Sequence, residues 1–132
     1  MLKAIRNLDY TIILCQDVAA MKRFYHELLG FPLYRDFGNW VELQVGASLL
    51  TLRERGAGYD GVREHDGPAP QDGTSALQLA FRVTPAEVDS CFSELRQKDV
   101  TILLPPTNQA SGHRTLFFKD PENNVLEIYA DL

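Results

Sequence analysis

Two charged side chains stand inside otherwise apolar runs of the sequence and are its best candidates for chemistry. Glu127 lies in the run 125–129, and Arg82 lies in the run 77–83. A carboxylate among apolar neighbours can act as a base, and a guanidinium can hold a ligand carboxylate or phosphate through two hydrogen bonds. An internal ion pair between Arg82 and Glu127 would explain the same residues without any ligand. The sequence leaves these interpretations open.

The side chains that alternate in phase with Glu127 predict a ligand-binding surface. Successive residues of a strand point to opposite faces, so each run divides into two sets. One set is aromatic and aliphatic with a few polar groups, which is the composition of a small-molecule pocket. Trp40 can stack on a ligand or pack against a neighbouring module, and Tyr10 can simply fill the interior of a barrel. The predicted ligand-binding residues are Tyr10, Ile12, Trp40, Thr51, Gln78, Arg82, Glu127 and Tyr129.

Capping chemistry predicts two helices. Asp17 can accept hydrogen bonds from the first backbone N–H groups of a helix over 18–29, and Gly30 can end that helix with a positive φ. Thr84 followed by Pro85 predicts the start of a second helix, because proline is well suited to the first helical position.

Short apolar and β-branched runs predict eight strands. We expect Pro105 and Pro106 to end the sixth strand, and His113 to lie in the loop before the seventh. The turn at 120–124 is expected to place one of its two asparagines in the left-handed region. The predicted strands cover 8–15, 31–36, 40–45, 48–53, 77–83, 100–104, 115–118 and 125–129.

The predicted elements repeat in the order β-α-β-β-β, which indicates an internal duplication. An offset of 68 residues (92 − 24 = 68) superimposes Phe24 on Phe92 and also Tyr10 on Gln78. Each half is too small to close a core alone, so the halves should share one within a chain or between chains. The stretch 56–73 is rich in glycine and proline and can be a connector or a lid. The sequence therefore predicts one α+β domain over 1–132, with modules at about 1–55 and 75–132 and a linker at about 56–74.

Composition excludes several classes of function. The chain has 132 residues, a net charge of −5 and two cysteines without metal-ligand spacing. An acidic chain of mixed charge lacks the basic surface that nucleic acids or anionic membranes attract. It also has no apolar run of membrane-spanning length. We expect a cytoplasmic protein with reduced thiols that binds neither nucleic acid nor membrane.

Three passages resemble the vicinal oxygen chelate superfamily, which includes glyoxalase I, bleomycin-resistance proteins, fosfomycin-resistance enzymes and extradiol dioxygenases. The passage 17–31 resembles the family's helix, which begins with Asp, carries Phe-Tyr and ends in Leu-Gly-Phe. The passages 80–83 and 120–127 resemble the family's fifth strand and its Asp-Pro-Glu/Asp-Gly-Asn motif, with Asn123 in place of glycine. The resemblance implies two βαβββ modules that form curled mixed sheets around a cup.

The resemblance also implies where metal-dependent members place their ligands. In this chain those positions hold Tyr10, Thr51, Gln78 and Glu127. The phenol of Tyr10 and the alcohol of Thr51 are poor metal ligands near neutral pH, so only Gln78 and Glu127 could coordinate a metal ion well. We therefore expect no resident metal or other cofactor, although weak binding of a divalent ion is possible.

Three functions fit these observations. The first is metal-independent binding of a small aromatic or planar ligand, as in antibiotic sequestration. The second is an enzyme of the superfamily, a lyase, isomerase or dioxygenase, that uses Glu127 with a weakly bound metal or none. The third is a non-catalytic regulatory or immunity-type partner. In each case we expect a homodimer, because the two modules should leave apolar sheet edges uncovered.

Overall fold

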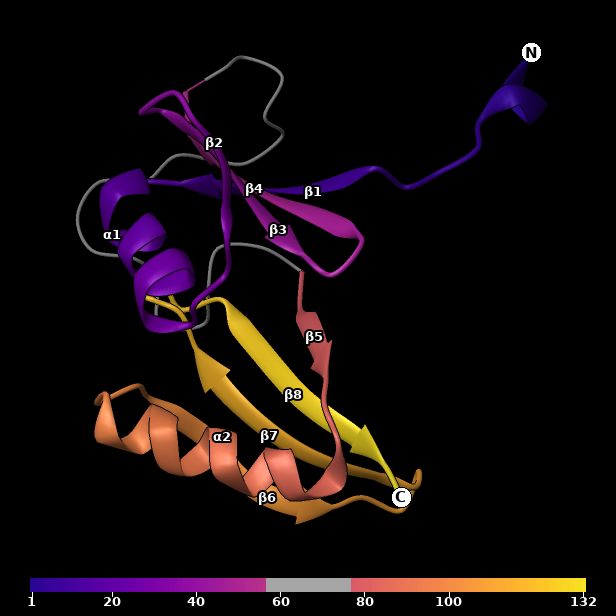
Figure 1. Ribbon diagram of the computed structural model, residues 1–132, viewed down its shortest axis with the longest axis vertical. Helices are drawn as coiled ribbons and strands as arrows, with labels where there is room; N and C mark the ends of the chain where they lie inside the picture. The colour runs from indigo at the N-terminus through magenta and orange to yellow at the C-terminus, as the bar shows by residue number, and fades with distance from the viewer. Residues whose placement is uncertain (57–76) are drawn as a thin grey trace. The chain divides into compact units, whose positions relative to one another are not determined.

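The chain divides into two units, Met1–His65 and Asp66–Leu132. The computed structural model describes residues 1–56 and 77–132 (Figure 1). Nearly all of the predicted linker, and with it the question of a lid, lies outside the described residues. Each unit is described by itself below.

The first unit contains one mixed sheet of four strands in the order β1-β4-β3-β2. Strand β1 runs parallel to β4, and the other neighbours are antiparallel. A two-residue turn at Gly46 joins β3 to β4, and this glycine has a φ of +57°. The elements are the 3-10 turn η1 (Leu2–Ala4), β1 (Tyr10–Cys15), α1 (Val18–Lys22), the helical segment η2 (Arg23–Leu28), β2 (Leu33–Asp36), β3 (Trp40–Val45) and β4 (Ser48–Glu54).

The first helix begins and ends as its capping residues predict. The side chain of Asp17 accepts a hydrogen bond from Ala20 N at 3.0 Å, and Gly30 has a φ of +83°. After Lys22, however, the α-helix continues as a π-helix over η2, where Leu29 N donates to Phe24 O at 2.9 Å. The wider turn accompanies the burial of two adjacent aromatic residues, Phe24 and Tyr25.

One face of the first sheet packs under this helix and forms the core of the unit. Both α1 and the sheet supply apolar side chains to it, and α1 contacts β3 and β4. Alternate residues of β1, β3 and β4 are buried on this face, as the sequence predicts. The core contains Ile13, Cys15, Val18, Met21, Phe24, Tyr25, Val41, Leu43, Leu50 and Leu52.

The second unit repeats the same plan, with a four-stranded mixed sheet in the order β5-β8-β7-β6. Strands β5 and β8 are parallel, and the remaining pairs are antiparallel. Its elements are β5 (Leu79–Arg82), α2 (Pro85–Gln97), β6 (Ile102–Asn108), β7 (His113–Lys119) and β8 (Val125–Asp131). The two βαβββ modules and the α+β class are confirmed.

Local signals also predict the ends of elements in the second unit. Thr84 and Glu87 form a capping box at the start of α2, with Pro85 as the first helical residue. In the turn before β8, Asn123 has a φ of +65° and occupies the left-handed region. The two carboxylate oxygens of Asp120 accept hydrogen bonds from Glu122 N, Asn124 N and Asn124 Nδ2 at 2.9–3.0 Å.

Several strand boundaries differ from prediction, and the largest differences are in β6 and β7. Strand β6 does not end at Pro105 but continues to Asn108, because β6 is an edge strand and tolerates residues without a ladder donor. Its pairing with β7 shifts register between Leu104 and Thr107, where the prolines lie. Strand β7 begins at His113, so the prediction that this histidine lies in a loop is wrong.

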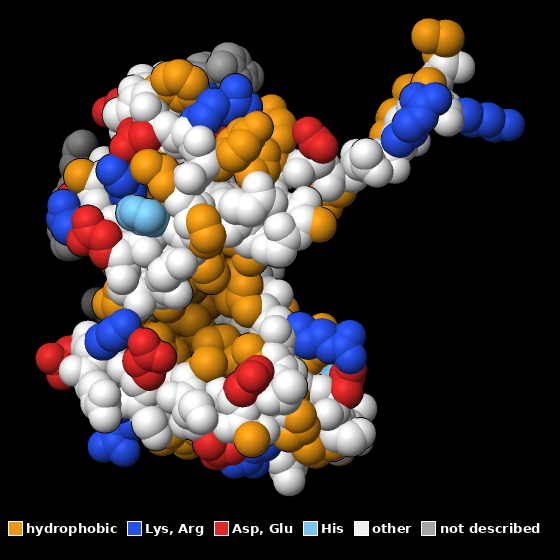
Figure 2. Space-filling view, in the orientation of Figure 1, with side chains coloured by type: hydrophobic (Ala, Val, Ile, Leu, Met, Phe, Trp, Pro, Cys, Tyr) orange, Lys and Arg blue, Asp and Glu red, His pale blue; other side chains and the backbone are white. Residues whose placement is uncertain are grey.

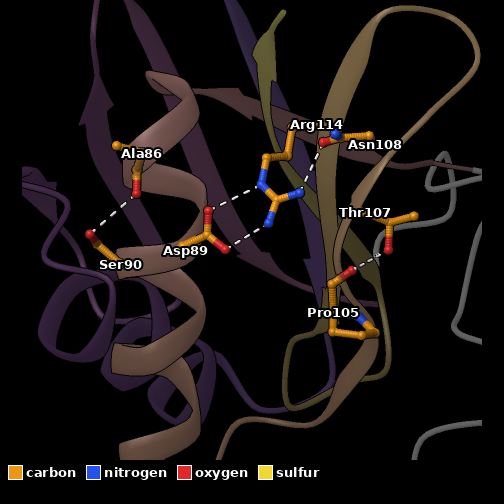
Figure 3. A network of polar contacts seen from close by, with 7 residues as sticks. All are labelled: Ala86, Asp89, Ser90, Pro105, Thr107, Asn108 and Arg114. Carbon is orange, nitrogen blue, oxygen red and sulfur yellow. Dashed lines mark hydrogen bonds and ion pairs between the residues drawn. The ribbon is translucent and has the colours of Figure 1, made fainter.

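An arginine fastens α2 to the sheet of the second unit (Figure 3). Arg114 donates from Nε and Nη2 to the two carboxylate oxygens of Asp89 on α2, at 3.0 and 2.7 Å. Its Nη1 donates to Asn108 Oδ1 on β6 at 2.9 Å. This hydrogen bonding lowers the pKa of Asp89 and raises the pKa of Arg114. The arginine therefore joins three elements of one unit.

Candidate functional site

In each unit the sheet face opposite the helix carries the predicted site residues. We call these surfaces the first open face and the second open face. Directly paired residues of neighbouring strands share a face, so the ladder register decides which side chains belong together. The first open face contains Tyr10, Ile12, Arg35, Trp40, Glu42, Thr51 and Arg53, and the second contains Ala80, Arg82, His113, Thr115, Phe117, Glu127, Tyr129 and Asp131.

An aromatic pair marks the first open face. The rings of Tyr10 and Trp40 lie edge to face, with centroids 6.3 Å apart and an interplanar angle of 76°. Tyr10 is 42% exposed and Ile12 is 37% exposed, and both lie on β1. Exposed aromatic and aliphatic side chains next to one another offer a flat apolar surface to a ligand.

Thr51 lies in the middle of the first open face and is completely buried, with 0% exposure. Ile12 of β1 and Glu42 of β3 lie directly opposite it on either side. Among the described residues its hydroxyl has no hydrogen-bond partner. Since a buried hydroxyl without a partner costs free energy, this position calls for an explanation.

Glu42 adds a buried carboxylate beside Thr51. Its side chain is only 6% exposed, and Arg35 Nε lies 2.7 Å from its Oε1. The arginine itself is more than half exposed, and its guanidinium also lies over the ring of Tyr34. The ion pair compensates the buried charge while leaving one carboxylate oxygen available to a further donor.

Glu127 occupies the centre of the second open face. It lies between Ala80 of β5 and Phe117 of β7, and it is partly buried. Gln78 is exposed one residue before β5 begins, and Tyr129 is partly buried opposite Arg82 and Thr115. The structure thus places Glu127 and Tyr129 on one surface and Gln78 at its margin.

Arg82 forms an ion pair with Asp131, not with Glu127. The alternative of an internal Arg82–Glu127 pair is therefore wrong: Arg82 lies opposite Tyr129, and Asp131 follows Tyr129 on the same face of β8. The other carboxylate oxygen of Asp131 lies 3.2 Å from His113 Nε2. The ring of His113 lies against that of Tyr129, with centroids 4.8 Å apart.

The four positions that the resemblance assigns to metal ligands do not make a good set of donors for a divalent ion. Within each unit the two positions lie on adjacent strands: Tyr10 and Thr51 on β1 and β4, Gln78 just before β5 and Glu127 on β8. Glu127 is the one anionic oxygen donor of the four near neutral pH. Among the described residues no three or more His, Cys, Asp or Glu side chains are grouped in a way that could hold a metal ion. These residues do not fit a tightly bound metal.

Sequence reasoning placed Glu42 opposite the core, in phase with Trp40, but did not place His113 and Asp131 on an open face. The signal for His113 was its even spacing from Thr115 and Phe117. Asp131 was missed because β8 was predicted to end at Tyr129. Strand ends depend on pairing, which a single strand's sequence does not encode.

Charge on the surface is mixed. Lys and Arg side chains are interspersed with Asp and Glu on both units in the view of Figure 2.

Both cysteines are free thiols, Cys15 buried and Cys91 partly buried. Burial, followed by the nearby charges of Glu94 and Glu87, raises the pKa of the Cys91 thiol and makes it a poor nucleophile. Within the part of the chain that the structure describes, no helix has the length and apolar character needed to cross a membrane.

Comparison with known proteins agrees with this architecture. The chain is 25% identical over 127 residues to the virulence protein STM3117 of Salmonella typhimurium, covering 94% of this chain and 83% of that protein. It is 26% identical over 125 residues to the glutathione transferase FosA of Serratia marcescens, covering 95% of this chain and 81% of that protein.

A solved structure shows the same fold. The crystal structure of a glyoxalase/bleomycin resistance protein/dioxygenase from Nocardioides matches with a TM-score of 0.78 at 18% identity, over 98% of this chain and 85% of that one. Residues 7–128 match the family described as the Glyoxalase/Bleomycin resistance protein/Dioxygenase superfamily. The chain belongs to that superfamily.

Proposed function

We propose that this protein binds a small planar aromatic ligand on its open faces without the help of a metal ion. The observation that carries the proposal is the first open face, where exposed Tyr10 and half-buried Trp40 share a surface with the buried Thr51 hydroxyl, which has no partner among residues 1–56 and 77–132. The aromatic rings offer stacking area, and the hydroxyl of Thr51 offers one fixed polar contact.

The polar groups of the first open face favour a ligand with a hydrogen-bond donor. The Thr51 hydroxyl can accept such a bond, and Glu42 has a carboxylate oxygen beyond the one that Arg35 contacts. Because Thr51 has 0% exposure, a ligand donor reaches its hydroxyl only when the covering side chains move aside, and the new hydrogen bond would then remove a free-energy cost of burial. An anionic ligand group would instead meet the buried carboxylate of Glu42 and bind less well.

Metal independence is supported by the chemistry of the donor set. Tyr10 contributes a phenol whose ring is engaged with Trp40, and Thr51 contributes a neutral alcohol. Neither group binds a divalent ion well near neutral pH. The proposed binding therefore involves no metal ion.

A second candidate is an enzyme of the same superfamily. The observation that favours it is the relative named glutathione transferase FosA, together with the central position of Glu127 on the second open face. Glu127 would then act as a base toward a bound substrate, with a weakly held divalent ion or none. A lyase, isomerase or dioxygenase reaction remains the expected range for this alternative.

We also propose that the protein is a cytoplasmic homodimer. In the first unit Leu2, Ile5 and Leu8 are highly exposed apolar residues before β1, and β1 is an edge strand. A second copy would cover such residues. Size-exclusion chromatography with light scattering should give twice the chain mass, and a single-chain mass at micromolar concentration would contradict the dimer.

Nuclear magnetic resonance of the single tryptophan tests the proposed function directly. Trp40 is the one tryptophan of the chain, so its indole N–H gives one assignable cross-peak. The cross-peak is followed during titration with 2-naphthol, 2-naphthoate and 2-naphthylmethylammonium in the presence of a chelator. These three probes share a planar ring system and differ in charge.

We expect a saturable shift of the Trp40 cross-peak with 2-naphthol and the weakest shift with 2-naphthoate. Tyr10→Ser should weaken binding severalfold, whereas Tyr34→Ser removes a similarly exposed tyrosine from β2 and serves as its control. The absence of a shift with all three probes, or equal losses in both variants, would contradict binding at the first open face.

A further inference from the structure

We propose that His113 is a proton acceptor on the second open face, oriented by Asp131, for a ligand that carries a weakly acidic hydroxyl group such as a phenol. The inference rests on the proposed function, because a planar ligand must reach this face. It goes beyond that function by naming an acid–base role for a residue outside the four positions that the family resemblance assigns.

The ladder places His113 directly opposite Asp131, on the same face as Glu127 and Tyr129. Its Nε2 lies 3.2 Å from Asp131 Oδ1. A carboxylate can only accept, so this contact favours a proton on Nε2 and leaves the lone pair of the neutral imidazole on Nδ1. The side chain is 41% exposed, which leaves it accessible to a ligand.

Two further residues position this histidine. Arg82 pairs with the second oxygen of Asp131, so the carboxylate is compensated while it faces the imidazole. The ring of Tyr129 lies against the imidazole at an interplanar angle of 33° and restricts its rotation. Arg82, Asp131 and Tyr129 are positioning residues, and His113 alone would contact the hydroxyl.

The site is separate from Glu127. Asp131 follows Glu127 by four residues on β8, which corresponds to about 13 Å along an extended strand. Glu127 and His113, which lies opposite Asp131, would therefore contact different parts of a ligand.

The proposed step is a simple proton transfer. The O–H bond of the ligand breaks, its electron pair stays on oxygen, and the proton moves to His113 Nδ1. The imidazolium that forms is stabilised by Asp131, and its positive charge in turn stabilises the phenolate. No oxidant, reductant or metal takes part.

His26 provides a matched control. Its Nδ1 lies 2.7 Å from the carbonyl oxygen of Phe31, which can only accept, so Nδ1 carries the proton. No carboxylate is recorded beside its ring among the described residues, and it belongs to the helical segment η2 of the first unit. The two histidines therefore differ in tautomer and in neighbours.

The test uses 4-nitrophenol, whose phenolate absorbs at longer wavelength than the neutral phenol, and 4-nitroanisole, which has no proton to give. The full chain is titrated at a pH where free 4-nitrophenol is mostly neutral. We expect phenolate absorbance to grow with protein concentration in the wild type and in His26→Gln. In His113→Gln it should vanish, with affinity for 4-nitrophenol lowered about tenfold or more, because a hydrogen bond to a charged group is lost.

Asp131→Asn should give a phenolate signal between those of the wild type and His113→Gln, and binding of 4-nitroanisole should change less than about twofold in either variant. Backbone N–H spectra verify that each variant is folded. Absence of phenolate absorbance in the wild type, or an unchanged signal in His113→Gln, overturns the inference. If the Trp40 cross-peak still shifts with 2-naphthol in that case, the proposed function stands and the inference alone has failed.

Discussion

Two buried threonines show how the open faces of the two units differ. Thr51 is buried in the first unit, and Thr115 is buried in the second, each on the face opposite its helix. The hydroxyl of Thr115 accepts a hydrogen bond from Gln109 Nε2 at 3.0 Å. The hydroxyl of Thr51 has no such partner within the described ranges.

The same contrast extends to the neighbouring side chains. On the second open face Arg82 and His113 both contact Asp131. On the first open face the Tyr10–Trp40 pair shares a surface with a hydroxyl that no residue of 1–56 or 77–132 satisfies. The comparison supports the proposals that the first face receives a ligand's donor and ring and that the second supplies oriented acid–base groups.

Removal of the tryptophan should have the largest effect on ligand binding. Trp40→Ala deletes the larger ring of the aromatic pair, so the affinity for 2-naphthol should fall about tenfold or more, because the aromatic contact contributes about 0.5–1.5 kcal/mol in addition to the apolar area that it buries. Calorimetric titration measures this loss, because the variant has no indole signal. An affinity within twofold of the wild type would place the ligand elsewhere.

Valine substitutions of the two threonines should change stability in opposite directions. Thr51→Val removes a hydroxyl without a partner in the described part of the chain and should stabilise the free protein by about 1 kcal/mol, while Thr115→Val breaks a hydrogen bond and should destabilise it by about 1 kcal/mol. Urea unfolding measures both changes in the free energy of unfolding.

Binding should respond to only one of these substitutions. Thr51→Val should weaken 2-naphthol about fivefold, since its acceptor is lost. Thr115→Val is the control and should leave the Trp40 titration unchanged. If Thr51→Val destabilises the free protein as much as Thr115→Val does, its hydroxyl has a partner and the contrast between the faces is wrong.

The ion pair between α2 and β7 should make stability depend on acidic pH. The hydrogen bond from Arg114 lowers the pKa of Asp89 below its ordinary value of 3.8. The stability it contributes is therefore complete above pH 3.8 and is lost as the pH falls through the lowered pKa of the folded state. Melting temperatures from pH 7 to pH 2 should fall less steeply below pH 4 in Asp89→Asn than in the wild type. Parallel curves would show that the pair contributes nothing.

Glu127→Gln should have the smallest effect on binding. The glutamine amide has the same shape as the carboxylate and can also accept a hydrogen bond from a neutral ligand. The affinity for 2-naphthol should therefore change less than about twofold. Any proton-transfer activity that depends on Glu127 would be abolished in the same variant. A large loss of affinity together with activity would show that Glu127 is mainly a binding or structural group.

Local chemistry made much of the fold predictable. Asp17 and Gly30 mark the ends of the first helical stretch because a cap and a positive φ are properties of a few neighbouring residues. Asn123 is predictable for the same reason. The alternation that places Ile13 inside and Ile12 outside needs only the period of a strand.

The remaining features depend on contacts that are distant in sequence. Pro105 lies within β6 because that strand is at a sheet edge, and edge positions follow from topology. His113 and Asp131 become strand residues by pairing with each other. The burial of Thr51, without a hydrogen-bond partner among the described residues, depends on its neighbours in β1 and β3, so no local sequence pattern predicts it.

The central claim is that a planar ligand binds beside Trp40 without a metal ion. Its most direct test follows the Trp40 indole cross-peak during titration with 2-naphthol, first with a chelator and then with a divalent ion added. The account predicts the same saturable shift and the same affinity under both conditions. A shift that is absent with the chelator and restored by the metal would contradict it.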